Sequence, residues 1–282
     1  MYRYTILIIS ILLPISLIAQ TKLSHFELGA SIGGMNYIGD LNHSSVLGRP
    51  EIGGGVMIRY NINDRWSVTA TGGYGHIQGG NPDVEALRNL SFRSRIWEVG
   101  VRAEFNFIAL GTKGVRLPFS PYLFCGAAFF SHNPTTQYLD PKTGETIIVD
   151  LQPLGTEGQG MANYPERTPY SLAQIALPFG IGVKWMVTDF MTLGAEYGLR
   201  KTWTDYLDDV SKTYVGKQAF GDATAAALSD RSGEVEKNHE YAAGTLRGDE
   251  TLDDWYTYFN INITFNMETL FGWMRSNKCE IK

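Results

Sequence analysis

Charged side chains recur at alternate positions within segments of this 282-residue sequence that are otherwise apolar. Glu98, Arg102 and Glu104 alternate with apolar residues, as Glu196 and Arg200 do further along the chain. Successive side chains of a strand point to opposite faces, so the charges of such a segment share one face. On facing strands they can form buried ion pairs. The predicted ion-pair set is Arg59, Glu98, Arg102, Glu104, Lys184, Glu196 and Arg200.

Residue types that serve catalysis or metal binding form no convincing motif. The five histidines lack metal-ligand spacing. Residues 29–33 match the spelling of a nucleophile elbow, but they read as a strand, whereas that motif needs a strand-to-helix turn. Ser131 and His132 are adjacent on a predicted strand and therefore point to opposite faces. We expect no catalytic residue, metal site or cofactor, and a lipid-modifying enzyme remains the weakest alternative.

Two acid-rich segments, 205–209 and 249–254, raise the question of calcium binding. Their spacing does not reproduce a calcium-binding loop. We expect them to be solvated residues that lie where loops join strands and that cap the strand ends.

The two cysteines lie in different environments. Cys125 falls within a predicted strand, where a small apolar side chain is an ordinary occupant. Cys279 lies beyond the last predicted strand. If it is exposed in an oxidising compartment, an interchain disulfide to a partner protein is its expected use, and an idle thiol is the alternative.

Alternation of apolar and polar residues identifies the elements that position these side chains. Trp97, Val99, Val101, Ala103 and other apolar residues lie on one face of a strand whose other face is polar or charged. The strand at 120–132 is apolar on both faces, so the sequence does not decide which face points inward. The eight predicted strands are 25–37, 52–62, 66–78, 97–107, 120–132, 175–185, 193–200 and 255–267.

Connections between the strands alternate in length. Short turns are expected at 62–65, 111–119 and 187–190. Long loops are expected at 38–51, 79–94, 133–174 and 205–253. Short periplasmic turns, long extracellular loops and an even number of long strands are typical of outer-membrane barrels. We predict an all-β fold, an eight-stranded antiparallel transmembrane β-barrel of the outer membrane. A soluble sandwich, the alternative, usually has strands of about five or six residues.

Composition agrees with a membrane barrel and excludes other classes. The chain is 44% hydrophobic and 19% charged, its mean hydropathy is −0.14, and it contains no apolar run long enough for a membrane-spanning helix of about 20 residues. Its basic residues are scattered, so no nucleic-acid partner is expected. Residues 1–19 read as a signal peptide, 20–267 as the barrel, embedded in outer-membrane lipid, and 268–282 as a periplasmic tail.

Several short sequence motifs in loops and at strand ends resemble those of a known family. Among them are Tyr37-Ile38-Gly39-Asp40-Leu41-Asn42, Leu154-Gly155-Thr156-Glu157-Gly158-Gln159-Gly160 and Thr204-Asp205-Tyr206-Leu207-Asp208-Asp209-Val210-Ser211. They resemble the PorG-like outer-membrane proteins of the Bacteroidota type IX secretion system. The resemblance implies a non-enzymatic barrel that works with a periplasmic ring of the lipoprotein PorK and its partner PorN.

The tail is the part of the chain that fits such a partner. Phe271, Trp273 and Cys279 are the candidate partner-binding residues, because they follow the last strand into the periplasm. Resting on the inner leaflet and a frayed terminus are alternatives for this segment. The rival function is an adhesin or recognition barrel acting through loops 133–174 and 205–253.

Overall fold

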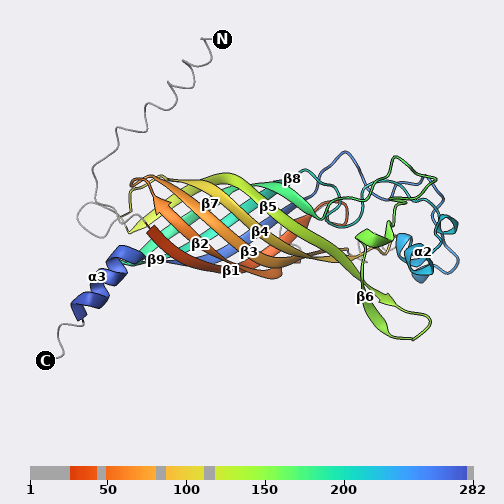
Figure 1. Cartoon of the computed structure of the whole chain (residues 1–282), viewed down its shortest axis with the longest axis horizontal. Coiled ribbons are helices and arrows are strands. Elements are labelled where there is room, and N and C mark those ends of the chain that lie inside the picture. The colour runs from red at the N-terminus through yellow and green to blue at the C-terminus, as the bar shows by residue number, and fades with distance from the viewer. Residues whose placement is uncertain (1–25, 43–48, 81–86, 111–117, 278–282) are drawn as a thin grey trace, which may run out of the picture.

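The computed structural model describes residues 26–42, 49–80, 87–110 and 118–277. The predicted signal peptide and Cys279 lie outside these residues. Nine strands form one antiparallel sheet, with short helices in the loops and one helix at the C-terminal end (Figure 1). The strands are β1 Phe26–Ile38, β2 Glu51–Asn61, β3 Trp66–Gly79, β4 Phe92–Asn106, β5 Phe119–Leu139, β6 Thr146–Asp150, β7 Ala173–Thr188, β8 Met191–Thr202 and β9 Trp255–Asn266. The α-helices are α2 Ala223–Ser229 and α3 Met267–Asn277.

Eight of the strands close into a barrel. β1 pairs with β9, as in the register Ile32 opposite Ile261, and β4 pairs with β5. β6 pairs only with the outer part of β5, where Gln137 lies opposite Ile148. The predicted eight-stranded antiparallel barrel is confirmed. β6 is an addition within the loop predicted at 133–174, because β5 continues past residue 132 and folds back as a hairpin.

The barrel is apolar outside and polar inside. Val99 on the outer wall is 69% exposed, whereas Arg59 and Glu104 on the inner face are buried. Such a wall is stable only in hydrocarbon, so this chain is a barrel of the outer membrane. In the described part of the chain, none of the helices is long and apolar enough to cross a membrane.

The inward face of β5 is now defined. Tyr122, Phe124 and Phe130 point into the barrel, while Cys125 points outward and is exposed. The lumen accepts these rings because glycines face them: a Cβ at Gly182 would lie 2.6 Å from the Tyr122 ring. Periodicity alone could not assign this strand, since both of its faces are apolar.

Loop lengths differ at the two ends of the barrel, as predicted. The turn between β2 and β3 is short, and the Asn63 side chain accepts hydrogen bonds from the amides of Arg65 and Trp66 at 2.9 and 2.8 Å. At the opposite end, residues 140–172 and 203–254 fold together into a cap over the barrel mouth (Figure 1). We call these two segments the cap.

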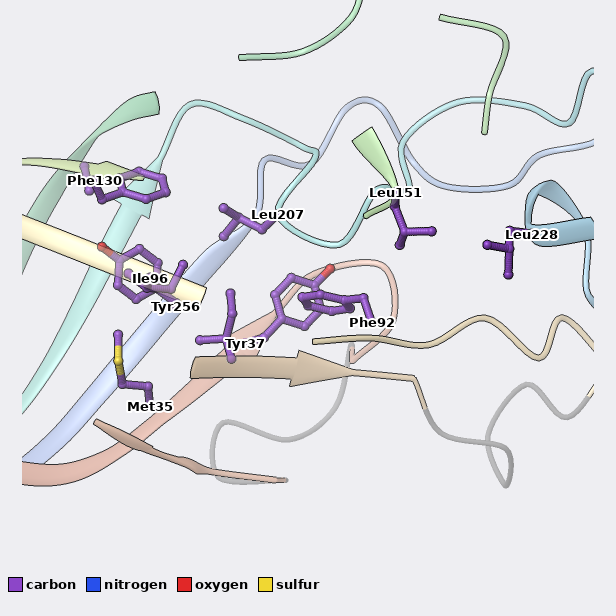
Figure 2. Close-up of a cluster of buried hydrophobic side chains, with 11 residues drawn as sticks. Met35, Tyr37, Phe92, Ile96, Phe130, Leu151, Leu207, Leu228 and Tyr256 are labelled. Atoms are coloured by element: carbon purple, nitrogen blue, oxygen red, sulfur yellow. The ribbon is translucent and has the colours of Figure 1, made fainter. Parts of the chain in front are cut away.

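Buried apolar side chains join the barrel to the cap. Met35, Tyr37 and Ile96 from the barrel belong to the same cluster as Leu207 and Leu228 from the cap (Figure 2). The cap is therefore packed onto the strands at this end of the barrel.

Candidate functional site

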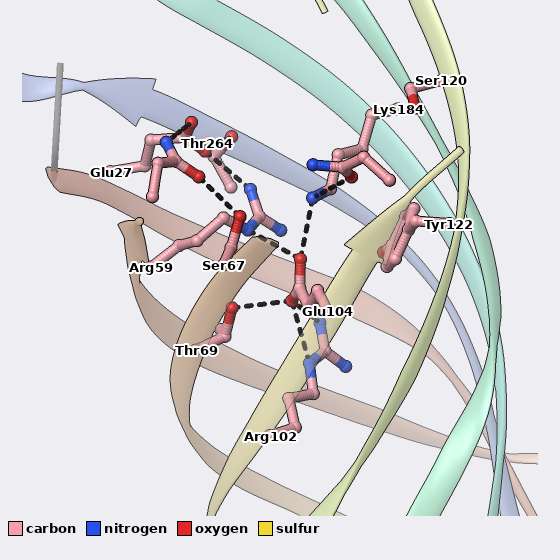
Figure 3. Close-up of polar contacts among 12 residues, drawn as sticks. Glu27, Arg59, Ser67, Thr69, Arg102, Glu104, Ser120, Tyr122, Lys184 and Thr264 are labelled. Atoms are coloured by element: carbon pink, nitrogen blue, oxygen red, sulfur yellow. Dashed lines mark hydrogen bonds and ion pairs between the residues drawn. The ribbon is translucent and has the colours of Figure 1, made fainter. Parts of the chain in front are cut away.

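An ion-pair network centred on Glu104 of β4 fills the lumen (Figure 3). Glu104 Oε2 lies 2.9 Å from Arg59 Nε and 2.8 Å from Lys184 Nζ. Its Oε1 accepts hydrogen bonds from the Thr69 hydroxyl at 2.7 Å and from Arg102 Nε at 3.1 Å. The carboxylate is fully buried. Three cations and a hydroxyl group thus replace water around it.

Glu27 of β1 belongs to this network and was not among the predicted residues. It accepts hydrogen bonds from Arg59 Nη1 at 2.6 Å and from Asn61 Nδ2 at 2.7 Å. Glu27 lies directly opposite Arg59 in the pairing of β1 with β2. Aligning those two strands in the sequence would have found it.

Arg102 connects Glu104 to a second carboxylate. Its two terminal nitrogens bind Glu196 at 2.9 and 2.5 Å, the fork geometry that suits guanidinium and carboxylate groups. The Tyr122 hydroxyl also donates to Glu196. The Arg102 guanidinium lies 4.4 Å from the centre of the Phe124 ring. The aromatic residues of β5 thereby help to hold the charges in place.

Arg200 and Glu98 form a further ion pair of the lumen. Arg200 Nε lies 3.3 Å from Glu98 Oε2, and the Tyr256 hydroxyl donates to the same oxygen at 2.6 Å. Glu98 thus shares its charge between a cation and a neutral donor.

Charges in the lumen balance. The structure brings together all seven predicted residues and adds Glu27. The cations are Arg59, Arg102, Lys184 and Arg200, and the carboxylates are Glu27, Glu98, Glu104 and Glu196. An eight-stranded barrel is only just wide enough for side chains, and here the side chains fill it. A cavity of about 40 Å³ beside Arg102 and Arg200 has room for a few water molecules.

Ser131 and His132 do not form a catalytic pair. His132 is buried, and its Nε2 lies 3.2 Å from the Ser171 carbonyl oxygen. Its ring stacks on that of Tyr170, with centroids 6.2 Å apart. In the described ranges, no group of three or more His, Cys, Asp or Glu side chains could hold a metal ion.

A buried ion pair also organises the cap. Arg247 Nη1 lies 3.1 Å from Glu157 Oε1, and Arg247 Nε donates to the Ser229 carbonyl oxygen at 3.1 Å. Glu157 Oε1 also accepts from the amides of Ser211 and Lys212 at 2.9 and 3.1 Å. The Glu157 carboxylate thereby joins segment 140–172 of the cap to two parts of segment 203–254, at residues 211–212 and at Arg247.

Other carboxyl groups of the cap lie at the barrel rim. Asp208 and Asp254 are buried and both contact the Tyr37 hydroxyl, at 2.6 and 2.9 Å. Burial raises the pKa of Asp208 to about 8 and the pKa of Asp254 well above its usual range. Burial also raises the pKa of Asp205 to about 8, an increase that the nearby Ser211 only partly offsets.

The expectation that the acidic segments would be solvated is wrong for four residues. Asp205, Asp208, Asp209 and Asp254 are buried, because the cap folds over the rim and covers them. Composition could not indicate this, since acidic loop residues are usually exposed.

At the opposite end of the barrel, α3 continues directly from β9 (Figure 1). Phe271 and Trp273 are 50% and 52% exposed. The Trp273 ring lies 5.6 Å from the Phe190 ring in the turn between β7 and β8. These two candidate partner-binding residues are thus exposed at the end of the barrel opposite the cap. The third, Cys279, lies outside the described residues.

Comparisons with known proteins give a family and distant structural likenesses. The family model described as "Domain of unknown function (DUF6089)" matches residues 3–152, just over half of the chain. No curated protein matches the sequence.

Among solved structures, Neisserial surface protein A is similar at 12% identity, with a TM-score of 0.41 over 86% of this chain and 96% of that one. The outer membrane protein OprG from Pseudomonas aeruginosa is similar at 10% identity, with a TM-score of 0.40 over 85% and 95%. Ail of Yersinia pestis, in complex with the heparin analogue sucrose octasulfate, is similar at 11% identity, with a TM-score of 0.38 over 86% and 98%. Likenesses this distant say nothing about what this chain binds.

Proposed function

The chain belongs to the DUF6089 family, and we propose that it is a non-enzymatic outer-membrane component of a type IX secretion system. In this role it anchors or organises the periplasmic ring of PorK and PorN. The resemblance of its loop spellings to PorG-like proteins supports the assignment to that machine.

A sealed lumen favours an anchor over a conduit. The four cations and four carboxylates of the lumen are held by one another and by aromatic side chains from β5 and β9. Opening a path for cargo would separate buried ion pairs, and breaking one such pair costs about 3–5 kcal/mol. A barrel of this kind contributes a fixed position in the membrane.

The observation that carries the proposal is the arrangement of α3. This helix follows the closing strand of the barrel without a loop and presents Phe271 and Trp273 at the periplasmic rim. Exposed aromatic side chains are the usual anchors of a protein interface. Cys279 follows α3 by two residues in the sequence and is the proposed site of a disulfide to the partner.

The first test replaces both aromatic anchors by alanine. Phe271→Ala with Trp273→Ala is expected to abolish recovery of PorK and PorN with the barrel after mild detergent extraction, as is deletion of residues 268–282. The barrel should still shift its gel mobility on heating, because α3 lies outside the lumen. Ile148→Ala is the matched control, an exposed apolar residue on β6 at the other end. Undiminished ring recovery with the folded double variant would reject the tether.

Cys279 has a separate readout. On a non-reducing gel, a band of higher mass is expected from the wild type and from Cys125→Ser but not from Cys279→Ser. The same pattern in all three proteins would remove the disulfide from the proposal and leave the aromatic contact to be judged alone.

The second candidate function is recognition at the cell surface. The hairpin of β5 and β6 favours it, since Leu139 and Ile148 are exposed there and one edge of β6 is unpaired among the strands that the structure describes. Deleting 140–145 should abolish surface attachment if this function is correct, and should leave ring recovery unchanged if the chain is an anchor.

A further inference from the structure

The hydroxyl group of Tyr37 lies between two buried carboxyl groups. Tyr37 Oη is 2.6 Å from Asp208 Oδ2 and 2.9 Å from Asp254 Oδ1. These residues come from the outer end of β1, the loop after β8 and the residue before β9. All three are at most 1% exposed.

Counting hydrogen atoms shows that this arrangement needs an extra proton. A tyrosine hydroxyl carries one hydrogen and can donate it to only one of the two carboxyl oxygens. The other carboxyl oxygen lies within hydrogen-bond distance of the phenol oxygen, and that contact is favourable only if the carboxyl group donates. One of the two aspartates is therefore a carboxylic acid whose proton points at Tyr37.

The remaining oxygens of both carboxyl groups are already in use. Asp208 Oδ1 accepts from the Val210 amide at 2.9 Å, and Asp254 Oδ2 accepts from the Leu207 amide at 2.9 Å. Each aspartate therefore fixes the loop backbone with one oxygen and meets Tyr37 with the other. The shared proton thus links β1 to both ends of the cap segment 203–254.

Among the residues that the structure describes, the surrounding charges do not supply a cation in place of the proton. Asp40 and Asp205 add negative charge to the group from the loops after β1 and β8. Arg247 is the guanidinium that acts on Asp208, but it is bound to Glu157 and to the Asp209 carbonyl oxygen. Arg88, from the loop before β4, donates to the backbone carbonyls of Asp40 and Arg247.

We propose that Asp208, Tyr37 and Asp254 share one proton that latches the extracellular cap to the barrel rim, so that the closed cap becomes less stable as pH rises. Two ionised aspartates would repel each other across the tyrosine oxygen in this buried site. Loss of the proton therefore acts directly on the contact that joins β1 to the cap.

The direction of the pH dependence follows from the raised pKa values of the two aspartates. A free aspartate has a pKa of about 3.9, whereas burial raises the pKa of Asp208 to about 8 in the folded cap. Below pH 4 the carboxyl groups are protonated in both closed and open forms. As pH rises from 4 to 8 only the open form ionises, so the latch loses stability over this range. The closed cap is favoured by acid.

Infrared spectroscopy tests for the proton itself, using the full chain in detergent. At pH 6 the wild type is expected to show the C=O stretching band of a buried protonated carboxyl group. Asp205 also has a pKa of about 8, so all variants are compared in an Asp205→Asn background. In that background the band should weaken on titration to pH 9 and be weaker at pH 6 in Asp208→Asn and in Asp254→Asn. The control is Asp253→Asn, next in sequence but in a partly exposed pair with Lys201. A band of undiminished intensity in Asp208→Asn and Asp254→Asn, or its absence from the wild type, would overturn the proposal.

Hydrogen exchange tests the latch. Cap opening at residues 203–214, corrected for intrinsic exchange, is expected to increase at least about tenfold between pH 6 and pH 9, the effect of releasing one proton over one unit or more. Asp254→Asn should flatten this dependence. Tyr37→Phe, which keeps the ring and removes the bridge, should open the cap even at pH 6. If the cap opens when a divalent-cation chelator is added at pH 6, a metal ion occupies the place of the proposed proton, and the proposal is refuted.

Discussion

The lumen and the cap both bury many charged groups, but they stabilise them differently. In the lumen four cations match four carboxylates. In the cap and its rim, seven buried carboxyl groups accompany one buried guanidinium among the described residues. The carboxyl groups are Asp40, Glu157, Asp205, Asp208, Asp209, Asp230 and Asp254, and the guanidinium is that of Arg247.

The backbone explains the difference. Strand amides in the barrel are already paired in the ladder, so a lumen carboxylate depends on side chains from other strands. Loop amides have no ladder, and carboxyl groups in the cap accept hydrogen bonds from them. Asp230, for example, accepts from the amides of Ser232 and Tyr241 at 2.9 and 2.8 Å. A folded loop can therefore bury a carboxyl group without a cationic side chain, provided that backbone amides donate hydrogen bonds to it or that it is protonated.

The largest effect is expected from removing the central charge of the lumen. Glu104→Gln leaves Arg59, Arg102 and Lys184 with one carboxylate too few, and should lower the free energy of unfolding by about 3–5 kcal/mol. Urea titration of the detergent-solubilised barrel measures it. Glu51→Gln is the control, because Glu51 pairs with the exposed Arg93 and should cost less than about 1 kcal/mol. Equal decreases in the free energy of unfolding for the two variants would mean that the buried lumen network stabilises the barrel no more than an exposed ion pair does.

An intermediate effect is expected from Glu157→Gln in the cap. Arg247 loses the charge of the partner with which it forms its closest ion pair, and one of the two oxygens that accept from the Lys212 amide becomes an NH2 group. Local opening should therefore become easier by about 3 kcal/mol. Hydrogen exchange in the cap should report this, while the unfolding of the barrel stays unchanged. Glu234→Gln, which affects an exposed pair with Arg231, is the matched control. If the barrel itself melted earlier, the cap and lumen would be one cooperative unit and the contrast would fail.

The smallest effect, of opposite sign, is expected from Asp205→Asn. Burial raises the pKa of this carboxyl group to about 8, so its ionisation opposes a closed cap increasingly as pH rises from 4 to 8. The neutral amide should stabilise the cap by about 1 kcal/mol at pH 8.5 and have almost no effect at pH 4. Hydrogen exchange at the two pH values distinguishes charge from shape, since an effect of equal size at both would implicate packing.

The lumen could be predicted from the sequence and the rim could not. A two-residue period places Glu98, Arg102 and Glu104 on one face whatever the rest of the chain does. By contrast, Tyr37 meets Asp208 and Asp254 across 171 and 217 residues. That contact depends on the path of irregular loops, which no local period specifies. The orientation of β5 could not be predicted either. Both of its faces carry aromatic residues, so the hydrophobic pattern does not show which face points into the barrel.

β9 connects the two ends of this molecule in a single stretch of chain. Asp254 immediately precedes it, α3 immediately follows it, and both of its edges are paired, to β1 and β8. An extended strand of 12 residues spans about 40 Å and cannot lengthen. A force applied to α3 would therefore be transmitted as tension along one strand that cannot lengthen, and would reach the hydrogen bond between Tyr37 and Asp254 at the other end of the barrel.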